Sequence, residues 1–428
     1  MSQSSRRRFI TRLAVACLAL SSLFERPATA IPALAYGRDA AEFLKAYHAD
    51  LAPTNRLFIA RKYALMSDSA IGFFRGSAPL FYRDLSEHPK LKTPIAIRLM
   101  GDLHLENASA YRTTNGAFAF DLDDFDEACV GPYSWELARV LVSLRLHLRE
   151  ANLSPAATER LVRRLLKGYL DRLAGYSQSP ASLNAPVTAG QVPGPAAEAI
   201  AAASRGSRAR QLAEWAPAGE LKTGKKQRPL DRATHQALAQ AVREYAAGRA
   251  EGEAFFRVKD AVRRVAGLAS LTRQRFLVLV EGPTRRASDD VLLDLKEQRA
   301  AAGTPWLPAG HGGSAERVRQ AWRYFVPDAD ALLGTLSMRG VSFLVKEFSP
   351  FRGEVEVDEL NSEARFGQYV DTVALLVARA HARSGQGTAI LQDSGGLDEL
   401  VKRLSDFTAA YAIQVEADRE IWKTYMDP

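Results

Sequence analysis

Apolar residues recur at helical spacing over much of this chain, beginning with residues 38–90. Successive apolar positions at the start of this segment lie three or four residues apart, which is typical of one face of an amphipathic helix. These positions are Ala40, Phe43, Leu44 and Tyr47. A dense apolar group at 71–76, which contains two glycines, interrupts the pattern. We therefore predict helices over residues 38–90 with a break at 71–76.

Short apolar runs at 95–100 and 117–122 predict two buried strands. Between them, Asn115 and Gly116 form a strong turn signal, so we expect a hairpin-like connection there. The remaining pattern predicts helices at 135–148, 155–173, 233–250, 314–325, 367–384 and 397–422, and strands at 260–265, 275–281, 291–296, 334–338 and 342–348. This arrangement of helices and strands predicts a helix-rich α+β fold.

Composition divides the chain into five parts. Residues 175–229 are dominated by Ala, Gly, Pro and Ser, which indicates a linker or insertion with short helices. Strand patterns gather in 230–350, between a mixed segment at 31–174 and a helical segment at 351–428. The first thirty residues have a separate character.

Residues 1–30 have the features of a twin-arginine signal peptide, since paired arginines precede a short apolar segment at 13–24. We expect the twin-arginine translocase to export the protein to the periplasm or elsewhere outside the cytoplasm. Small residues predict cleavage after Ala30 or Ala35. Lipidation at Cys17 is disfavoured, because Leu13 stands one place too early in the sequence to be the leucine of a lipobox. No internal stretch reaches the roughly 18–20 apolar residues of a spanning helix, so no stable membrane span is expected after cleavage.

Charge and cysteine content narrow the possible partners. The formal net charge is +8, and half of it comes from the first thirty residues, so the remainder makes a weak case for binding nucleic acid. No aromatic residues alternate with Lys and Arg in a way that would stack bases. After signal removal Cys129 is the sole cysteine, which excludes an intramolecular disulfide.

The first chemical motif is the segment from Gly101 to Asn107, directly after an apolar strand. Asp102 stands five places before Asn107, which is the catalytic-loop spacing of kinases. An aspartate there orients and deprotonates an acceptor hydroxyl, and the asparagine oxygen holds a metal on the phosphates. Hard cations such as Mg²⁺ or Mn²⁺ prefer these oxygen ligands. We expect His104 to orient the loop rather than to bind metal.

The second motif is an acidic run that follows a predicted strand. Four aspartates fall within six residues, an arrangement that is costly unless a positive charge balances it. These are Asp121, Asp123, Asp124 and Asp126. Asp121 ends the apolar strand fourteen residues after Asn107, close to the kinase spacing, so we predict Asn107 and Asp121 as metal ligands, with Asp123 or Asp124 assisting. The alternative is a solvated acidic loop.

The third motif, Gly131 to Arg139, is a proline turn followed by an acidic residue and a helix. In small-molecule kinases such a segment braces the catalytic loop, and Glu136 would take that role here. Together, residues 101–139 resemble the aminoglycoside phosphotransferase and choline kinase group. The closer resemblance is to the bacterial family called domain of unknown function 2252, and it covers nearly all of the mature chain in order. The segments that carry it are 73–76, 101–107, 121–127, 131–139, 264–270, 295–297 and 378–384.

This resemblance implies a protein-kinase-like, two-lobed fold with an unusual order of parts. The glycine-bearing turn follows the catalytic loop, and its Gly267 and Ser270 could approach nucleotide phosphates through backbone N–H groups. Lys296 on the next strand would reach the α- and β-phosphates, although it could instead be a surface lysine. Its helical partner would be Glu316, but the aligned position is Gln320, which lacks the charge. We therefore expect a circularly permuted kinase-like fold.

Two further side chains have open roles. Arg75 could reach the acidic site, where a salt bridge to an aspartate and a contact with substrate phosphate are both open. His381 lies on a long helix between Arg379 and Arg383, which is more typical of a packed or surface histidine than of a ligand.

These observations favour an exported phosphotransferase that uses Mg²⁺ or Mn²⁺ and ATP or another nucleotide. Its acceptor would be a small molecule or a component of the cell envelope. Because ATP is scarce outside the cytoplasm, a pseudokinase that binds a phosphorylated ligand is the alternative. A metal-dependent phosphoesterase at the same carboxylates is the third hypothesis.

Overall fold

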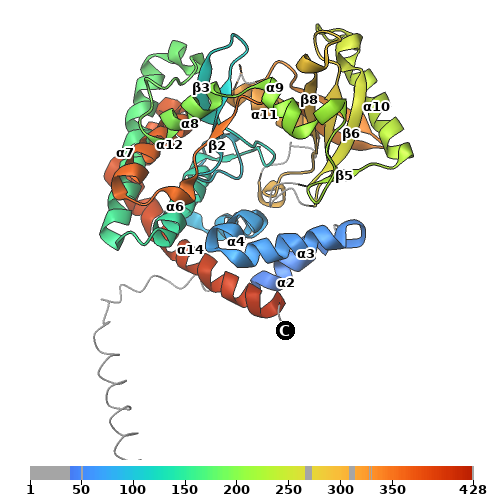
Figure 1. Ribbon diagram of the computed structural model, residues 1–428. Coiled ribbons are helices and arrows are strands. Elements are labelled where there is room, and N and C mark those ends of the chain that lie inside the picture. Colours follow the sequence, from blue (N-terminus) through green and yellow to red (C-terminus); the bar gives the residue numbers. More distant parts are fainter. Residues whose placement is uncertain are drawn as a thin grey trace, which may run out of the picture. The chain divides into compact units, whose positions relative to one another are not determined.

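The computed structural model describes residues 39–49, 52–265, 272–307, 314–326, 328 and 330–426, and it has the α+β architecture that the sequence predicts (Figure 1). The α-helices are α2 (Ala40–Tyr47), α3 (Ala52–Asp68), α4 (Ala70–Gly76), α5 (Ala78–Glu87), α6 (Tyr133–Glu150), α7 (Pro155–Gln178), α8 (Pro195–Ser204), α9 (Arg208–Trp215), α10 (Arg232–Ala246), α11 (Ala315–Phe325), α12 (Glu363–Ala382), α13 (Gly387–Ser394) and α14 (Leu397–Met426). The strands are β1 (Ala96–Leu99), β2 (Ala108–Arg112), β3 (Phe118–Leu122), β4 (Cys129–Pro132), β5 (Gln227–Pro229), β6 (Val258–Arg264), β7 (Arg275–Val280), β8 (Val291–Glu297), β9 (Gly334–Met338), β10 (Val341–Glu347) and β11 (Gly353–Glu354). Among the described residues, no helix is long and apolar enough to cross a membrane.

Helix α6 forms the centre of the helical part, where it packs against α7, α14 and α4. Every side chain from Tyr133 to Leu148 is buried. A helix that is enclosed on all sides must pair its polar groups within the protein, because a buried charge without a partner is costly. The partners of Glu136, Arg139 and His147 therefore shape the surrounding loops.

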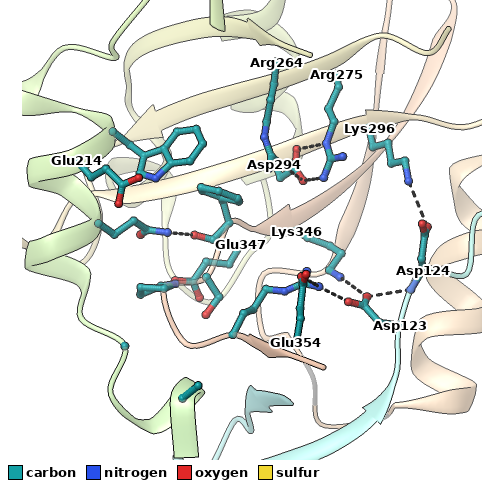
Figure 2. A pocket seen from close by; sticks show the side chains of 18 of the residues that line it. Asp123, Asp124, Glu214, Arg264, Arg275, Asp294, Lys296, Lys346, Glu347 and Glu354 are labelled. Atoms are coloured by element: carbon teal, nitrogen blue, oxygen red, sulfur yellow. Dashed lines mark hydrogen bonds and ion pairs between the residues drawn. The ribbon is translucent and has the colours of Figure 1, made fainter. Parts of the chain in front are cut away.

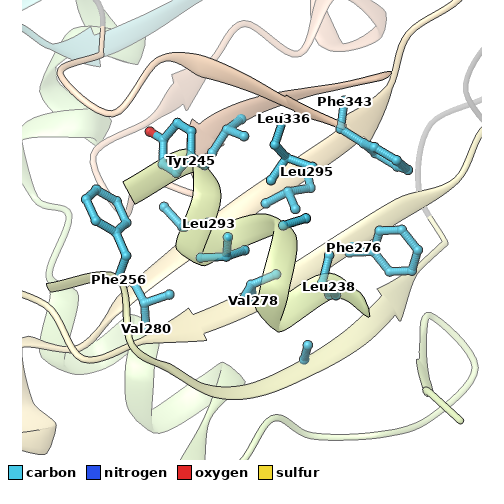
Figure 3. Close-up of a cluster of buried hydrophobic side chains, with 14 of the residues drawn as sticks. Leu238, Tyr245, Phe256, Phe276, Val278, Val280, Leu293, Leu295, Leu336 and Phe343 are labelled. Atoms are coloured by element: carbon cyan, nitrogen blue, oxygen red, sulfur yellow. The ribbon is translucent and has the colours of Figure 1, made fainter. Parts of the chain in front are cut away.

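A six-stranded antiparallel sheet, in the order β5-β6-β7-β8-β10-β9, forms the second part of the fold. The strand residues alternate between its two faces. Phe276, Val278 and Leu293 pack under α10, as Figure 3 shows, in a large apolar cluster. Leu277 and Leu292 lie on the opposite face, where they contact the segment that contains α9. Because both faces are covered, the central strands are nearly continuous runs of apolar residues, as the sequence pattern indicated.

Two small sheets connect these parts. Strands β2 and β3 form the predicted hairpin around Gly116, whose φ of 87° suits glycine, and β11 pairs with β2. Strand β1 pairs with β4, a short strand that the sequence pattern did not reveal. The apolar group at 71–76 is itself helical, because Ser69 caps α4 by accepting a hydrogen bond from Gly72 N at 2.9 Å. Residues 71–76, where the sequence predicted a break, therefore belong to a separate short helix, α4.

Candidate functional site

The hairpin of β2 and β3 brings the end of the 101–107 loop beside the acidic run. In its register Ala108 lies opposite Leu122, so the next residues outward are Asn107 and Asp123. Asp123 N donates a hydrogen bond to Asn107 O at 2.8 Å. These two residues and Asp124 line one cavity of about 260 Å³. An amide oxygen and two carboxylates therefore share one cavity, and such oxygen groups suit a hard divalent cation.

The six-stranded sheet supplies the opposing positive charge. Leu293 and Leu295 face α10, so Asp294 and Lys296, which alternate with them, face the other side. The same alternation on β10 directs Lys346 to that side. The strand periodicity therefore places a row of charged residues on the sheet face that α10 does not cover.

This face forms one wall of a cavity of about 940 Å³, which Figure 2 shows from close by. Its basic lining residues are Arg205, Arg210, Arg264, Arg275, Lys296, Lys346 and Arg352; its acidic ones are Asp123, Asp124, Asp126, Glu214, Asp294, Glu347 and Glu354; and Trp215, Trp322 and Phe348 add aromatic surface. The cavity is large enough for a nucleotide-sized ligand, since small-molecule sites span roughly 300–1,000 Å³. Cations, carboxylates and aromatic rings together can match a ligand that combines phosphate with a planar group.

Ion pairs across the cavity hold the Asp123 carboxylate ionised. Asp123 pairs with Arg352 and lies 3.7 Å from Lys346 Nζ, while Ser109 Oγ donates to its Oδ2 at 2.9 Å. Burial by itself raises the pKa of Asp123, but Arg352 and Lys346 outweigh it and hold the pKa well below its ordinary value. Asp123 is therefore a carboxylate anion at neutral pH.

Lys296 makes the corresponding contacts on the sheet side. Its Nζ lies 2.5 Å from Asp126 Oδ2 and 3.2 Å from Asp124 Oδ1. Burial works against ionisation of Asp126, yet Lys296 and Arg273 lower its pKa to about 2. The same two carboxylates raise the pKa of Lys296 against the effect of burial. The lysine is therefore a charged group of the cavity and not a surface lysine.

Asp124 adopts an uncommon backbone conformation, with a φ of 68°. A residue with a Cβ loses roughly 1–2 kcal/mol in this left-handed region. Such strain tends to concentrate at functional sites, where surrounding contacts enforce it. Here Phe125, which is fully buried and stacks on Phe325 of α11 at 4.9 Å between ring centroids, anchors the next residue. The anchored phenylalanine holds the Asp124 carboxylate at the edge of both cavities.

Asp102 lies deeper and has a different electrostatic state. Arg139 of α6 donates to its Oδ1 through Nε at 2.6 Å and forms an ion pair with it. Burial raises the pKa of Asp102 to about 6, although Arg139 partly offsets that effect. A carboxyl with this pKa suits a proton acceptor near neutral pH. Its present hydrogen bonds, however, are directed at the arginine.

Several contacts fix the 101–107 loop. Glu136 Oε1 accepts hydrogen bonds from Met100 N at 2.6 Å and Gly101 N at 3.1 Å, at the start of the loop. Its Oε2 lies 3.1 Å from Nε2 of the buried His381. Gly101 has a φ of 92°, and a Cβ there would collide with the carbonyl of Glu127. The loop therefore needs glycine at this position.

His104 lies in the same loop and is buried. Its backbone N donates to Asn107 Oδ1 at 3.0 Å, which closes the loop on itself. Burial lowers the pKa of the His104 imidazole, so the ring is neutral. Asn107 Oδ1 thus stabilises the loop by accepting from His104 N, and a metal bound to Asn107 would use the same oxygen.

Asp121 is separated from this group by its own partner. Its carboxylate is buried and pairs with Arg379 of α12, and Oδ1 accepts from Leu122 N at 2.9 Å. The cavities described above are lined by Asp123 and Asp124 instead. The structure therefore brings Asn107 together with Asp123 and Asp124, while Asp121 belongs to the contact between β3 and α12.

The remaining predicted residues are placed as follows. Arg75 Nη1 lies 2.5 Å from Glu106 Oε2, so its carboxylate partner lies in the loop and not in the acidic run. Glu316 pairs with Arg319 of its own helix, and Gln320 donates to the same carboxylate at 3.0 Å. The partner of Lys296 is therefore found in the acidic run.

Gly267 and Ser270, predicted to contact phosphate, lie outside the described residues. So do residues 1–38, which include the predicted signal peptide and Cys17. Cys129 is buried, and burial raises the pKa of its thiol, which argues against a role as nucleophile.

Comparison with known proteins identifies the family. Residues 56–427 match the model of the family described as "Uncharacterized protein conserved in bacteria (DUF2252)". The chain belongs to this family. No curated protein and no solved structure matched the chain.

Lys346, Arg352 and Asp294 are among the charged groups of the cavity in this DUF2252 family member that were not predicted. Lys346 and Asp294 had a usable signal, because alternation along a strand whose apolar residues face one side directs these residues to the other. Arg352 had none, since it reaches Asp123 from the loop after β10, far away in sequence.

Proposed function

We propose that this DUF2252 family member is a kinase-like phosphotransferase that binds a nucleotide with Mg²⁺ or Mn²⁺ and transfers a phosphoryl group. The observation that carries the proposal is the cavity in which cations from a β-sheet, chiefly Lys296 and Lys346, face Asp123 and Asp124 beside Asn107. Catalysis of phosphoryl transfer consists mostly of positioning and charge neutralisation, which such a set of groups can supply.

The order of elements supports this reading. Strands β6 and β7 come before and after the segment that contains Gly267; β8 carries Lys296; and α11 follows. Kinases place their glycine loop, their lysine on the third strand and their next helix in this order. Because the 101–107 loop comes earlier in the chain, the arrangement would be circularly permuted.

The acidic run offers a second parallel. Protein kinases follow the metal-binding aspartate with a phenylalanine whose packing sets the active state. Asp124 and Phe125 have this relation, since Phe125 stacks on Phe325 and meets Trp322 edge-on, both on α11. We therefore assign the metal-binding carboxylates of the proposed site to Asp123 and Asp124, in place of Asp121.

Asn107, Asp123 and Asp124 fit a hard cation, because their oxygens line one cavity and Asp123 is held ionised. A metal held by these residues would supply positive charge to neutralise phosphate. Arg352 and Lys346, which now neutralise Asp123, would be released toward those phosphates. Lys296 would hold the phosphates from the sheet side.

A binding module without turnover is the second candidate, and Asp102 favours it. The carboxylate that would accept the proton of an acceptor hydroxyl is buried and held by Arg139. If that ion pair persists with ligand bound, the site would hold a nucleotide or another phospho-ligand and leave it intact.

The test combines binding with turnover in the mature protein, residues 31–428. Thermal shifts are measured with ATP, with Mg²⁺ or Mn²⁺ and with both, and phosphate release is followed in parallel. A ligand at about 100 times its dissociation constant stabilises the fold by roughly 2.7 kcal/mol. We expect a shift that needs metal and nucleotide together. It should disappear in Asp123→Asn and persist in Glu214→Gln, which removes a carboxylate from another wall of the large cavity.

Each outcome has a distinct meaning. A shift with turnover supports the phosphotransferase, and a shift without turnover supports the binding module. Release of phosphate from an ester without nucleotide would support a phosphoesterase. No shift with any nucleotide would overturn the proposed site.

Export through the twin-arginine route remains part of the proposal, and its support is the motif in residues 1–30. Fractionation of cells that express the full chain should place the protein outside the cytoplasm. Replacing Arg6 and Arg7 by lysine should retain it inside, whereas an unchanged distribution would refute this route.

A further inference from the structure

A second group of potential metal ligands lies beside the 101–107 loop. Glu106 belongs to that loop, His147 to α6, and Asp358 to a 3₁₀ turn at Val357–Glu359. One potential ligand atom from each lies within 4.8 Å of the others. His147 Nδ1 is 3.3 Å from Asp358 Oδ1. The three residues are far apart in sequence, so no spacing motif predicts this group.

Buried polar atoms without hydrogen-bond partners give independent support. His104, whose side chain is 4% exposed, directs an unpartnered Nδ1 to within 3.5 Å of Glu106 Oε2. The nitrogen of His147 that faces Asp358 is Nδ1, and the side chain is 1% exposed. Unsatisfied buried groups of this kind are rare, and a bound ion is one way in which a protein satisfies them. Arg75 is the cation now paired with Glu106.

We propose that Glu106, His147 and Asp358 form a site for a divalent transition metal such as Zn²⁺. An imidazole beside two carboxylates suits Zn²⁺, whereas Mg²⁺ prefers oxygen ligands alone. Zinc ligands lie about 2.0–2.2 Å from the metal, so the three atoms must draw closer together. Asp358 can make that adjustment, because 75% of its side chain is exposed. The unpartnered Nδ1 of His104 lies beside this group, 3.5 Å from Glu106 Oε2.

The site is distinct from the proposed nucleotide site but shares a cavity with it. The cavity of about 260 Å³ has Glu106 and Asp358 in its lining as well as Asn107 and Asp123. Zinc there ties Glu106, the neighbour of Asn107, to α6 and to the turn at 357–359. The metal thus fixes the loop that presents Asn107.

The experiment uses the full chain without a histidine tag, stripped of metal by a chelator. Zn²⁺ is titrated calorimetrically in excess Mg²⁺, and Co²⁺ is added separately to look for visible d–d absorption. We expect one equivalent of Zn²⁺ to bind despite the Mg²⁺. Asp358→Asn, at an exposed position where folding should be intact, and His147→Gln should each weaken binding at least tenfold. Glu359→Gln, an exposed neighbour on the same turn, should leave binding unchanged.

Absence of Zn²⁺ binding, or equal affinity in Asp358→Asn and the parent protein, would overturn the proposal. The Asp123→Asn variant separates this site from the nucleotide site, because it should lose the metal–nucleotide thermal shift and keep its Zn²⁺. Loss of Zn²⁺ in Asp123→Asn would also contradict the proposal, since it would place the metal at the other end of the cavity.

Discussion

Replacement of Asp121 by asparagine separates a structural role for this residue from a ligand-binding role. The carboxylate pairs with Arg379, whose side chain is 2% exposed, and asparagine would leave the guanidinium charge without its counter-ion. Removal of one partner from a buried pair costs about 3–5 kcal/mol. The Asn side chain can still accept from Leu122 N, and Arg379 Nη1 still donates to Ala185 O, so the lower end of that range is expected.

The assay is urea unfolding followed by circular dichroism, combined with the thermal-shift titration of metal and nucleotide. We expect Asp121→Asn to unfold at lower urea and yet to show a ligand-induced shift like that of the parent protein. Asp123→Asn should show the reverse, with a smaller stability loss and no ligand-induced shift. Parent-like stability of Asp121→Asn together with loss of the shift would refute this reasoning and return Asp121 to the metal site.

Three further predictions follow from the same contacts. Asp124→Gly should be more stable than Asp124→Asn by about 1 kcal/mol in urea unfolding, because glycine removes the strain of the positive φ while both variants lose the charge; equal stability would mean that the backbone is not strained. The pKa of Asp102 is raised to about 6, so the folded state holds its proton more tightly than the unfolded state, and this residue's contribution to stability falls as the pH rises from about 4 to 6. Subtraction of the Asp102→Asn stability curve from the parent curve should therefore slope downward over that range, and a flat difference would contradict the raised pKa. Leu277→Ala, at a fully buried position of the sheet, should cost about 2–5 kcal/mol of unfolding free energy. Ligand binding should persist at urea concentrations below the unfolding transition. A cost below about 1 kcal/mol would contradict the packing described for that face.

Local patterns predicted most of the fold. The helix predicted at 155–173 is present as α7, where Ser154 accepts from Ala157 N and Pro155 is the first helical residue. Alternation and apolar runs located β6, β7, β8, β9 and β10, and the Asn-Gly turn located the β2–β3 hairpin. Strand β4 was missed because its four residues include Gly131 and Pro132, which lower strand propensity, and pairing with β1 compensates for them.

The site was harder to predict because its partners are distant in sequence. Asp121 and Asp123 look alike as members of one acidic run, and their main ion-pair partners, Arg379 and Arg352, lie more than 220 residues away. The spacing from Asn107 selected Asp121, whereas the turn after β3 directs the next two aspartates into the cavity. No local signal distinguishes a carboxylate that pairs with a helix from one that faces a ligand.

The most direct test of the central claim is calorimetric titration of the mature protein with ATP in the presence and absence of Mn²⁺, repeated with Asp124→Asn. We expect one nucleotide per chain, bound only with the metal, and at least tenfold weaker binding in the variant. Absence of binding in the parent protein, or metal-independent binding that Asp124→Asn leaves unchanged, would contradict a metal–nucleotide site at Asn107, Asp123 and Asp124.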